Sequence, residues 1–277
     1  MKSVAILLTV FNRKEKTLQC LQHLIKQLPV DSYETDIYLT DDGCTDGTPE
    51  VVREKFPEVN IIRGDGNLYW NRGMHQAWLA ASAERNYDFY LWLNDDTNLF
   101  PKALSALLEG SSRHDDKAII CGATCSEKKK TMTYGGRNAK GELTPPNGEL
   151  HPCEYFNGNI VLIPRSVFQL IGNLDPAYTH ALGDFDYGMR AREVGIEIYQ
   201  APNFIGTCEQ HDTLPKWCDS GYPLKVRLKH FRSPLGGHPR EQFRFEKRHY
   251  GSLRACFHYL TIHLRVLIPQ LWEKDKL

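Results

Sequence analysis

The first 125 residues alternate between short apolar runs and segments with helical spacing, and this alternation constrains the fold more than any other feature. Apolar runs of strand length lie at residues 4–9, 36–40, 60–62, 87–93 and 118–122, and helical spacing lies at 14–28, 48–56, 71–83 and 101–108. Strands that alternate with helices form a parallel sheet with helices on both faces. Ligands of such sheets bind outside the carboxyl ends of the strands, so we expect a functional site there.

The pattern changes after Thr124. Residues 126–152 are polar and rich in Lys, Gly and Pro, which predicts a loop or hairpin. Further on, the sequence predicts strands at 155–163 and 196–200, helices at 165–170 and 183–194, a loop-rich stretch at 208–240 and helical spacing at 241–271. We therefore expect one domain over 1–223, with halves 1–125 and 126–223, and a separate extension over 224–277.

The charge distribution supports this division. The chain has 34 basic and 34 acidic residues, and this neutral balance argues against a general nucleic-acid binder. Residues 1–223 carry a net charge of −8, whereas residues 224–277 carry 12 basic and 4 acidic residues, a net charge of +8. The extension is therefore chemically distinct from the rest.

Two further features point to a cytoplasmic protein. The longest apolar stretch, 5–11, is far shorter than the roughly 20 residues that span a bilayer, and no cleavable signal peptide is visible. The eight cysteines include no Cys-x-x-Cys pair, so we expect reduced thiols. A zinc site of Cys208, His211 and Cys218 is an alternative that the missing paired spacing argues against.

Acidic clusters occur at 40–48, 93–96 and 183–186, where strands are expected to end. Clustered carboxylates repel one another unless positive charge lies among them. A divalent cation with a diphosphate supplies that charge, because hard cations prefer oxygen ligands. Each cluster alone could be a set of turn residues, but three in one alternating chain favour the cation.

These clusters belong to a longer series of motifs: LTVFNR at 8–13, DDGCTDGT at 41–48, NDD at 94–96, NG at 157–158, GDFD at 183–186 and RAR at 190–192. In this order they resemble the family 2 inverting glycosyltransferases, over about residues 2–212. The resemblance implies an α/β fold of the GT-A nucleotide-sugar-binding type, with a mostly parallel central sheet flanked by helices and a basic helical C-terminal extension. Residues 1–125 would be the nucleotide-binding half and 126–223 the acceptor half.

The resemblance also implies which residues bind the nucleotide. Thr9 and Asn12 would lie at the base and ribose, although Thr9 could instead pack within its strand. Asp42, rather than Asp41, would accept the N3–H of a uracil or thymine base. Asp46 more simply caps the helix that follows.

In the NDD motif, the resemblance makes Asp96 the ligand of Mg²⁺ or Mn²⁺ and places Asp95 at the ribose or a metal-bound water. The metal would neutralise the diphosphate and improve it as a leaving group. His211 would be a third ligand or a diphosphate contact, or else a surface histidine.

The GDFD motif matches the place of the general base. Asp184 would accept the proton of the acceptor hydroxyl, with Asp186 as the alternative if the register differs. Gly183 stands where the family usually has Glu. Asn157, Gly158 and Asp186 would line the acceptor side.

The GDGNLYWNRG loop at 64–73 is similar to that of rhamnosyltransferases. Asn71 and Arg72 would lie at a helix N-terminus, which favours an anion such as the donor diphosphate, or would serve only as a cap and turn. Tyr69 and Trp70 could stack on a sugar or base, or simply pack.

The basic extension, with interleaved aromatic residues, predicts a helix at a membrane surface. The same helix could pack on the catalytic domain or on another subunit, which would make a homodimer. Arg244 or Arg248 could also close over the donor diphosphate. Nucleic-acid binding is disfavoured.

Together these features predict a cytoplasmic, metal-dependent inverting glycosyltransferase, with dTDP-rhamnose or a UDP-hexose as donor. A peripheral position at the inner face of the membrane is the alternative to a purely cytoplasmic one. A polysaccharide or lipid-linked acceptor would make it part of cell-surface glycan synthesis. A sugar nucleotidyltransferase would need a Gly-rich, Arg-bearing loop after the first strand, which residues 9–12 are not. A catalytically inactive nucleotide-sugar-binding or scaffold protein remains the alternative, which Asp42, Asp96 and Asp184 argue against and Gly183 leaves open.

Overall fold

The computed structural model describes residues 1–30, 32–210 and 214–273. The chain divides into two compact units. The larger α/β unit comprises Met1–Pro176 and Gly183–Gln210, and the smaller helical unit comprises Ala177–Leu182 and His211–Leu277.

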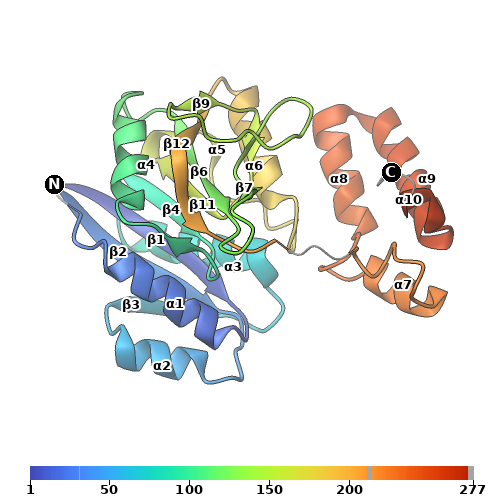
Figure 1. Ribbon diagram of the computed structural model, residues 1–277, viewed down its shortest axis with the longest axis horizontal. Helices are drawn as coiled ribbons and strands as arrows, with labels where there is room; N and C mark the ends of the chain where they lie inside the picture. The colour runs from blue at the N-terminus through green and yellow to red at the C-terminus, as the bar shows by residue number, and fades with distance from the viewer. Residues whose placement is uncertain (31, 211–213, 274–277) are drawn as a thin grey trace. The chain divides into compact units, whose positions relative to one another are not determined.

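A mixed sheet is the centre of the α/β unit (Figure 1). Within the described residues it has ten strands, with the main order β3-β2-β1-β4-β11-β6-β12-β5, while β7 pairs with β6 and β9 with β12. These strands are β1 (Lys2–Val10), β2 (Tyr33–Asp41), β3 (Val59–Arg63), β4 (Phe89–Leu93), β5 (Asn98–Leu99), β6 (Ile119–Cys125), β7 (Met132–Tyr134), β9 (His151–Pro152), β11 (Ile160–Pro164) and β12 (Ile198–Thr207). A separate pair joins β8 (Gly136–Arg137) to β10 (Tyr155–Phe156).

Strands β3, β2, β1 and β4 are parallel, as the alternating sequence predicts. The next strand, β11, runs antiparallel to both β4 and β6. The residues that lead into β11 therefore lie beside the residues that follow β4. The sequence did not predict this reversal, which lies in the segment after Thr124.

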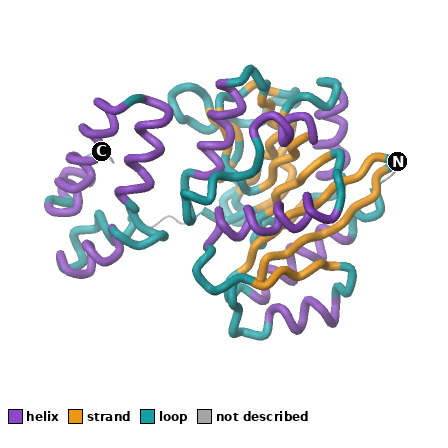
Figure 2. Tube along the Cα trace, turned by 180° about the vertical axis from the view of Figure 1, so that it is seen from behind, coloured by secondary structure: helices purple, strands orange, loops and turns teal. Residues whose placement is uncertain are grey.

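Two layers of helices cover the sheet, because its strands are apolar on both faces. In β4, Phe89, Leu91 and Leu93 join one buried cluster, and Tyr90 and Trp92 join the other. The first cluster takes residues from α1 (Lys14–Ile25), α2 (Thr48–Lys55) and α4 (Ala103–Ser112), and the second from α3 (Tyr69–Glu84), α5 (Arg165–Ile171) and α6 (Gly183–Glu193). Figure 2 shows strands and helices in this unit from the opposite side.

The helical unit contains α7 (Leu224–Phe231), α8 (Pro239–Tyr250), α9 (Ser252–Leu267) and α10 (Gln270–Glu273). The expected continuous helix over 241–271 is interrupted at Gly251, whose φ of +89° ends α8. Trp217 and Cys218 are buried with Phe231 and Val266, so this unit begins earlier than residue 224. None of the described helices is long and apolar enough to cross a membrane.

Trp78 is a test of the second buried cluster. Its ring is fully buried on α3 and lies 5.0 Å from Phe168, 5.2 Å from Tyr90 and 5.6 Å from Trp92, between ring centroids. We expect Trp78→Ala to lower the free energy of unfolding by about 3–5 kcal/mol in urea titrations, because it leaves a large cavity. The neighbouring Leu79 is 45% exposed, and Leu79→Ala should change stability by about 0.5 kcal/mol or less. Equal losses in the two variants would contradict this packing.

Candidate active site

The acidic motif at 94–96 directly follows β4, which is buried along its whole length. The side chain of Asp95 is 7% exposed, and burial raises the pKa of Asp95 to about 6, although Arg13 opposes the shift. The side chain of Asp96 is 14% exposed. Asp96 is therefore the more accessible of the two carboxylates.

Two cationic side chains stabilise this motif. Arg13 donates hydrogen bonds through Nη1 to Asp95 Oδ1 and Asp96 Oδ2, both at 3.0 Å. Lys16 Nζ lies 3.7 Å from Asp96 Oδ2. Sequence reasoning did not assign these residues, although Arg13 ends the LTVFNR motif and was available as a signal.

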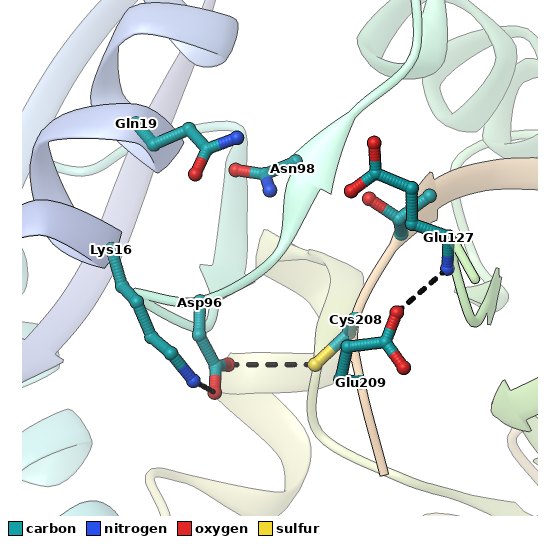
Figure 3. A pocket seen from close by; sticks show the side chains of 8 residues that line it. Lys16, Gln19, Asp96, Asn98, Glu127, Cys208 and Glu209 are labelled. Carbon is teal, nitrogen blue, oxygen red and sulfur yellow. Dashed lines mark hydrogen bonds and ion pairs between the residues drawn. The ribbon is translucent and has the colours of Figure 1, made fainter.

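A small pocket of about 170 Å³ opens beside Asp96 (Figure 3). It is lined by Lys16, Gln19, Asp96, Asn98, Glu127, Thr207, Cys208 and Glu209. Cys208 donates to Asp96 Oδ1 at 3.5 Å, and burial raises the pKa of the Cys208 thiol to about 12. The thiol is therefore a protonated donor, and Asp96 lies between it and Lys16.

Asp96 is the residue of this pocket that is expected to hold a divalent cation, and that expectation stays a prediction. Among the described residues no group of three or more His, Cys, Asp or Glu side chains surrounds a common metal position, and His211 lies outside those residues. Mg²⁺, however, commonly takes one or two carboxylates and completes its shell with water and substrate phosphates. Asp96 offers such a carboxylate, but Arg13 and Lys16 contact its Oδ2 and Cys208 its Oδ1, so a cation would have to displace one of these partners.

Asp42 is buried and serves as an anchor for the loop before α3. Its carboxylate accepts the N–H groups of Gly66, Leu68 and Tyr69 at 2.9 to 3.1 Å. A carboxylate has about four lone-pair sites, and these contacts occupy them. To accept a base N3–H, Asp42 would have to release one of these donors, so the expected base contact stays a prediction.

The loops after β1 and β2 are joined through Asn12. Its Oδ1 accepts the N–H of Thr45 at 2.8 Å, and its own N–H donates to Cys44 Sγ at 3.2 Å. Thr9 is buried near the end of β1, and its expected contact with the base and ribose stays a prediction. Asp46 accepts the N–H of Thr48, the first residue of α2, at 3.0 Å, although the N-cap residue of that helix is Gly47.

Asn71 is fully buried at the start of α3, and its Nδ2 donates to the carbonyl of Asp175 at 2.8 Å. Arg72 Nε donates to the carbonyl of Pro176 at 2.9 Å. These contacts support the 175–176 backbone, and the donor contacts expected for both residues remain predictions. A Cβ at Gly183 would lie 1.7 Å from Asn71 Oδ1. The Asn71 amide thus occupies the space that a larger residue at 183 would need.

Asp184 lies in the first turn of α6 with a partly exposed side chain. Its Oδ2 accepts the N–H of Gly158 at 2.9 Å, and its Oδ1 accepts the N–H of Phe185 at 2.9 Å. Burial raises the pKa of Asp184 to about 6, although these N–H groups and Arg137 oppose the shift. A carboxylate with such a pKa can accept a proton near neutral pH.

Gly158 connects Asp184 to the acidic motif. The neighbouring Asn159 carbonyl accepts the N–H of Asn94 at 2.9 Å, and Trp70 Nε1 donates to Asn94 Oδ1 at 2.6 Å. A Cβ at Gly158 would lie 2.5 Å from the Trp70 ring, so only glycine fits there. Trp70 thus packs between the two motifs.

Two other residues expected at the acceptor side, Asp186 and Asn157, each form a hydrogen bond to a nearby arginine. Asp186 is fully buried and accepts a hydrogen bond from Arg190 Nε at 2.8 Å, so it stabilises α6 and is inaccessible to a substrate. Its burial argues against the alternative that Asp186 is the base, which stays a prediction. Asn157 Oδ1 accepts from Arg137 Nε at 3.2 Å, which orients the segment before Gly158.

Comparisons with known proteins agree with this geometry. Residues 5–172 match the family model of Glycosyl transferase family 2. A curated relative from Mycobacterium tuberculosis (strain ATCC 25618 / H37Rv), N-acetylglucosaminyl-diphospho-decaprenol L-rhamnosyltransferase, is 26% identical over 196 residues. The aligned region is 59% of this chain and 63% of the relative, so the chain spans less than two thirds of the relative's length.

Solved structures show the same fold at low sequence identity. S. aureus TarS 1-349 has a TM-score of 0.56 and 14% identity, covering 90% of this chain and 72% of that one. The mannosyltransferase PcManGT from Pyrobaculum calidifontis, in complex with GDP-Man and Mn²⁺, has a TM-score of 0.57 and 13% identity, covering 95% and 73%. The expected GT-A fold is therefore confirmed.

The family match extends over more than half of the residues and includes β1, β2, β4 and the 94–96 motif. Together with the rhamnosyltransferase relative, it confirms the resemblance drawn from the motifs. The chain belongs to glycosyl transferase family 2.

Proposed function

We propose that this glycosyltransferase is inverting and metal-dependent, and that it transfers a sugar from a nucleotide diphosphate donor to a hydroxyl of a polysaccharide or lipid-linked acceptor. The observation that carries the proposal is the backbone link through Gly158 and Asn159. It joins Asp184, a carboxylate with a pKa raised to about 6, to the acidic motif at Asn94.

The proposed reaction is one in-line displacement. The acceptor oxygen attacks the anomeric carbon, and its proton passes to Asp184. The bond between the anomeric carbon and the phosphate oxygen breaks, and the nucleoside diphosphate leaves with the electron pair. A single displacement inverts the anomeric configuration. The N–H groups of Gly158 and Phe185 hold the Asp184 carboxylate in one orientation for the proton transfer.

Asp96 would hold Mg²⁺ or Mn²⁺ together with the donor diphosphate, and the bound cation would neutralise charge on the leaving group. Arg13 orients Asp95 and Asp96 from one side. Two structures with a similar fold contain Mn²⁺, and they support a divalent cation here. They are PcManGT in complex with GDP-Man and Mn²⁺, and GalNAc-T7 with UDP, GalNAc and Mn²⁺.

For the donor we propose dTDP-rhamnose, with a UDP-hexose as the alternative. The M. tuberculosis relative, N-acetylglucosaminyl-diphospho-decaprenol L-rhamnosyltransferase, supports both the sugar and a lipid-linked acceptor. The loops at Thr9, Asn12 and Asp42 would take the pyrimidine nucleotide. Gly183 gives no support to an inactive scaffold, because Asn71 accounts for a glycine there.

We also propose that the helical unit binds an anionic membrane surface, which would place the protein at the inner face of the membrane. An apolar stripe on α9 is exposed, with fractions from 45% to 91%: Leu253, Phe257, Leu260, Leu264 and Leu267. Both described acidic residues between 224 and 271, Glu241 and Glu246, are buried. The exposed charged residues there are all basic: Lys225, Lys229, Arg232, Arg240, Arg244, Lys247, Arg248 and Arg254. Anionic lipid complements this surface, whereas a second copy would bring like charges together.

The general base is tested by pH. We expect release of nucleoside diphosphate from the donor to rise through about pH 6 and to level off above it, because Asp184 must be deprotonated to accept a proton. Asp184→Asn should lower kcat by about 10²–10⁴-fold and remove this rise with pH, the acidic limb of the pH–rate profile. Asp186→Asn serves as a comparison, since it should alter stability and leave the limb in place. A limb that survives in Asp184→Asn would assign the base to another residue.

The cation site is tested by calorimetry, in which UDP or dTDP is titrated into the protein. The titrations are made in the presence of Mn²⁺, of Mg²⁺ or of EDTA. Asp96→Ala should weaken metal-dependent binding by about 10–100-fold or more, because it removes the protein ligand. Glu127→Ala, at an exposed carboxylate of the same pocket, is the matched control and should bind as the parent does. Unchanged binding in Asp96→Ala would move the cation elsewhere.

The membrane surface is tested by sedimentation with vesicles of phosphatidylglycerol, phosphatidylcholine alone being the control. Leu253→Ser and Leu260→Ser should each weaken binding by about tenfold, since each removes apolar area that enters the lipid. High salt should weaken it further. Absence of vesicle binding, or a dimer in analytical ultracentrifugation that these variants dissociate, would contradict the lipid surface.

A further inference from the structure

Trp70 lies between two segments of the candidate site. Its indole Nε1 donates to Asn94 Oδ1 at 2.6 Å, and Asn94 is the first residue of the acidic motif at 94–96. The outer edge of its six-membered ring faces Gly158, since a Cβ built on this glycine would lie 2.5 Å from Trp70 Cη2 and 2.6 Å from Cζ2. Trp70, Asn94 and Gly158 belong to the α/β unit, so both contacts lie within one compact unit.

Gly158 also contacts Asp184, which belongs to the same unit. The Gly158 N–H donates to Asp184 Oδ2 at 2.9 Å, and a Cβ on Gly158 would lie 3.2 Å from the Asp184 Cβ. Gly158 is buried and is thus enclosed by the Trp70 ring and the Asp184 side chain. A displacement of the ring edge would therefore alter the position from which the Gly158 N–H meets the carboxylate.

The backbone of Asn94 is fixed by other contacts. Its N–H donates to the Asn159 carbonyl at 2.9 Å, and its carbonyl accepts from the Thr97 N–H at 3.1 Å and from Cys20 Sγ at 3.3 Å. Asn94 therefore cannot follow a displaced indole without loss of these bonds. A partly buried acceptor without a donor is costly, so the Asn94 side chain would reorient if the Trp70 N–H were removed.

The position of Trp70 is itself imposed by its surroundings. Tyr69, the first residue of α3, has a φ of +57°, a left-handed conformation that is uncommon for a bulky side chain. The Tyr69 N–H donates to the buried Asp42 carboxylate at 2.9 Å. The Trp70 ring meets Trp92 of β4 edge-on at 6.1 Å between centroids. The indole is therefore held through its own backbone and against the sheet.

We propose that Trp70 is a positioning residue of this protein: its indole fixes the separation between Asn94, which begins the acidic motif, and Gly158, which holds the Asp184 carboxylate. The inference rests on the proposed roles of Asp96 and Asp184. Trp70 thereby has a task that is distinct from stacking on a sugar or base, because its N–H and its outer ring edge both meet protein atoms.

The experiment compares Trp70→Phe, Gly158→Ala and their double variant in the full chain, with Mn²⁺ and with dTDP-rhamnose or whichever UDP-sugar the parent protein uses. Phenylalanine keeps an aromatic ring but lacks the N–H and the outer edge of the indole. Gly158→Ala inserts a methyl group against that edge. We expect each single variant to lower kcat by about 10–100-fold with a much smaller change in the donor KM, since a small misplacement of reacting groups is enough.

The double variant separates positioning from independent packing effects. Losses at two independent sites would multiply. The shorter phenylalanine ring, however, leaves room for the methyl group of Gly158→Ala, so the double variant should lose no more kcat than Trp70→Phe alone.

The acidic limb of the pH–rate profile should move to higher pH in Trp70→Phe and in Gly158→Ala. Burial raises the pKa of Asp184, and the Gly158 N–H opposes this shift. A weaker hydrogen bond from Gly158 therefore lets the pKa of Asp184 rise further, and a higher pH is needed to deprotonate it.

Trp78→Phe is the matched control. Trp78 lies on the same helix and is fully buried, and within the described part of the chain its Nε1 has no hydrogen-bond partner. The substitution thus disturbs a tryptophan of α3 that contacts neither Asn94 nor Gly158. It should lower the melting temperature and leave kcat and the acidic limb unchanged.

Amide exchange at Gly158, followed by NMR on ¹⁵N-labelled protein without donor, tests the inference independently of turnover. Protection of this amide relative to the amides of β11 should fall by about fivefold or more in Trp70→Phe and stay as in the parent in Trp78→Phe. This result supports the inference even if no donor is turned over, in which case only the proposed function fails.

Unchanged relative protection of Gly158 in Trp70→Phe overturns the inference. Multiplied kcat losses in the double variant, or an equal kcat loss in Trp78→Phe, overturn it as well.

Discussion

The reversed direction of β11 is the constraint on which the candidate site depends. In the register of this strand, Ile160 pairs with Leu93, the last residue of β4. The residues before β11 therefore reach the residues after β4. Two hydrogen bonds complete the junction: the Asn94 N–H donates to the Asn159 carbonyl, and the Gly158 N–H donates to the Asp184 carboxylate. A parallel strand in this place would bring its carboxyl end to the edge instead. The two motifs meet because one strand is reversed.

Three carboxylates at this edge have different surroundings, and the surroundings separate their chemistry. Asp95 is buried against Arg13, Asp96 is partly exposed between Lys16 and Cys208, and Asp184 is held by backbone N–H groups. Burial raises the pKa of both Asp95 and Asp184 to about 6, but only Asp95 has a cation directly bonded to it. The different surroundings thus allow Asp96 to hold a cation and Asp184 to accept a proton, as proposed above.

Local pattern was enough to predict the parallel half of the sheet, whereas the roles that the motifs give Asp96 and Asp184 stay predictions. The runs at 4–9, 36–40 and 60–62 became β1, β2 and β3, because strand length and apolar content are local properties. What the sequence left undetermined depends on contacts between distant residues. The burial of Asp186 follows from Arg190, and the glycine at 183 follows from Asn71, more than 100 residues away.

The discontinuity of the helical unit has a consequence for how such enzymes can be recombined. Its six-residue segment, 177–182, lies inside the α/β unit's sequence and its helices lie at the C-terminus. Within this unit the Thr179 hydroxyl donates to Glu241 Oε1 of α8 at 2.6 Å. A chimera joined at a single boundary near residue 210 would inherit Thr179 from one parent and Glu241 from the other. Exchange of this unit between relatives therefore requires two grafts, and substitutions at 179 and 241 are expected to be inherited as a pair.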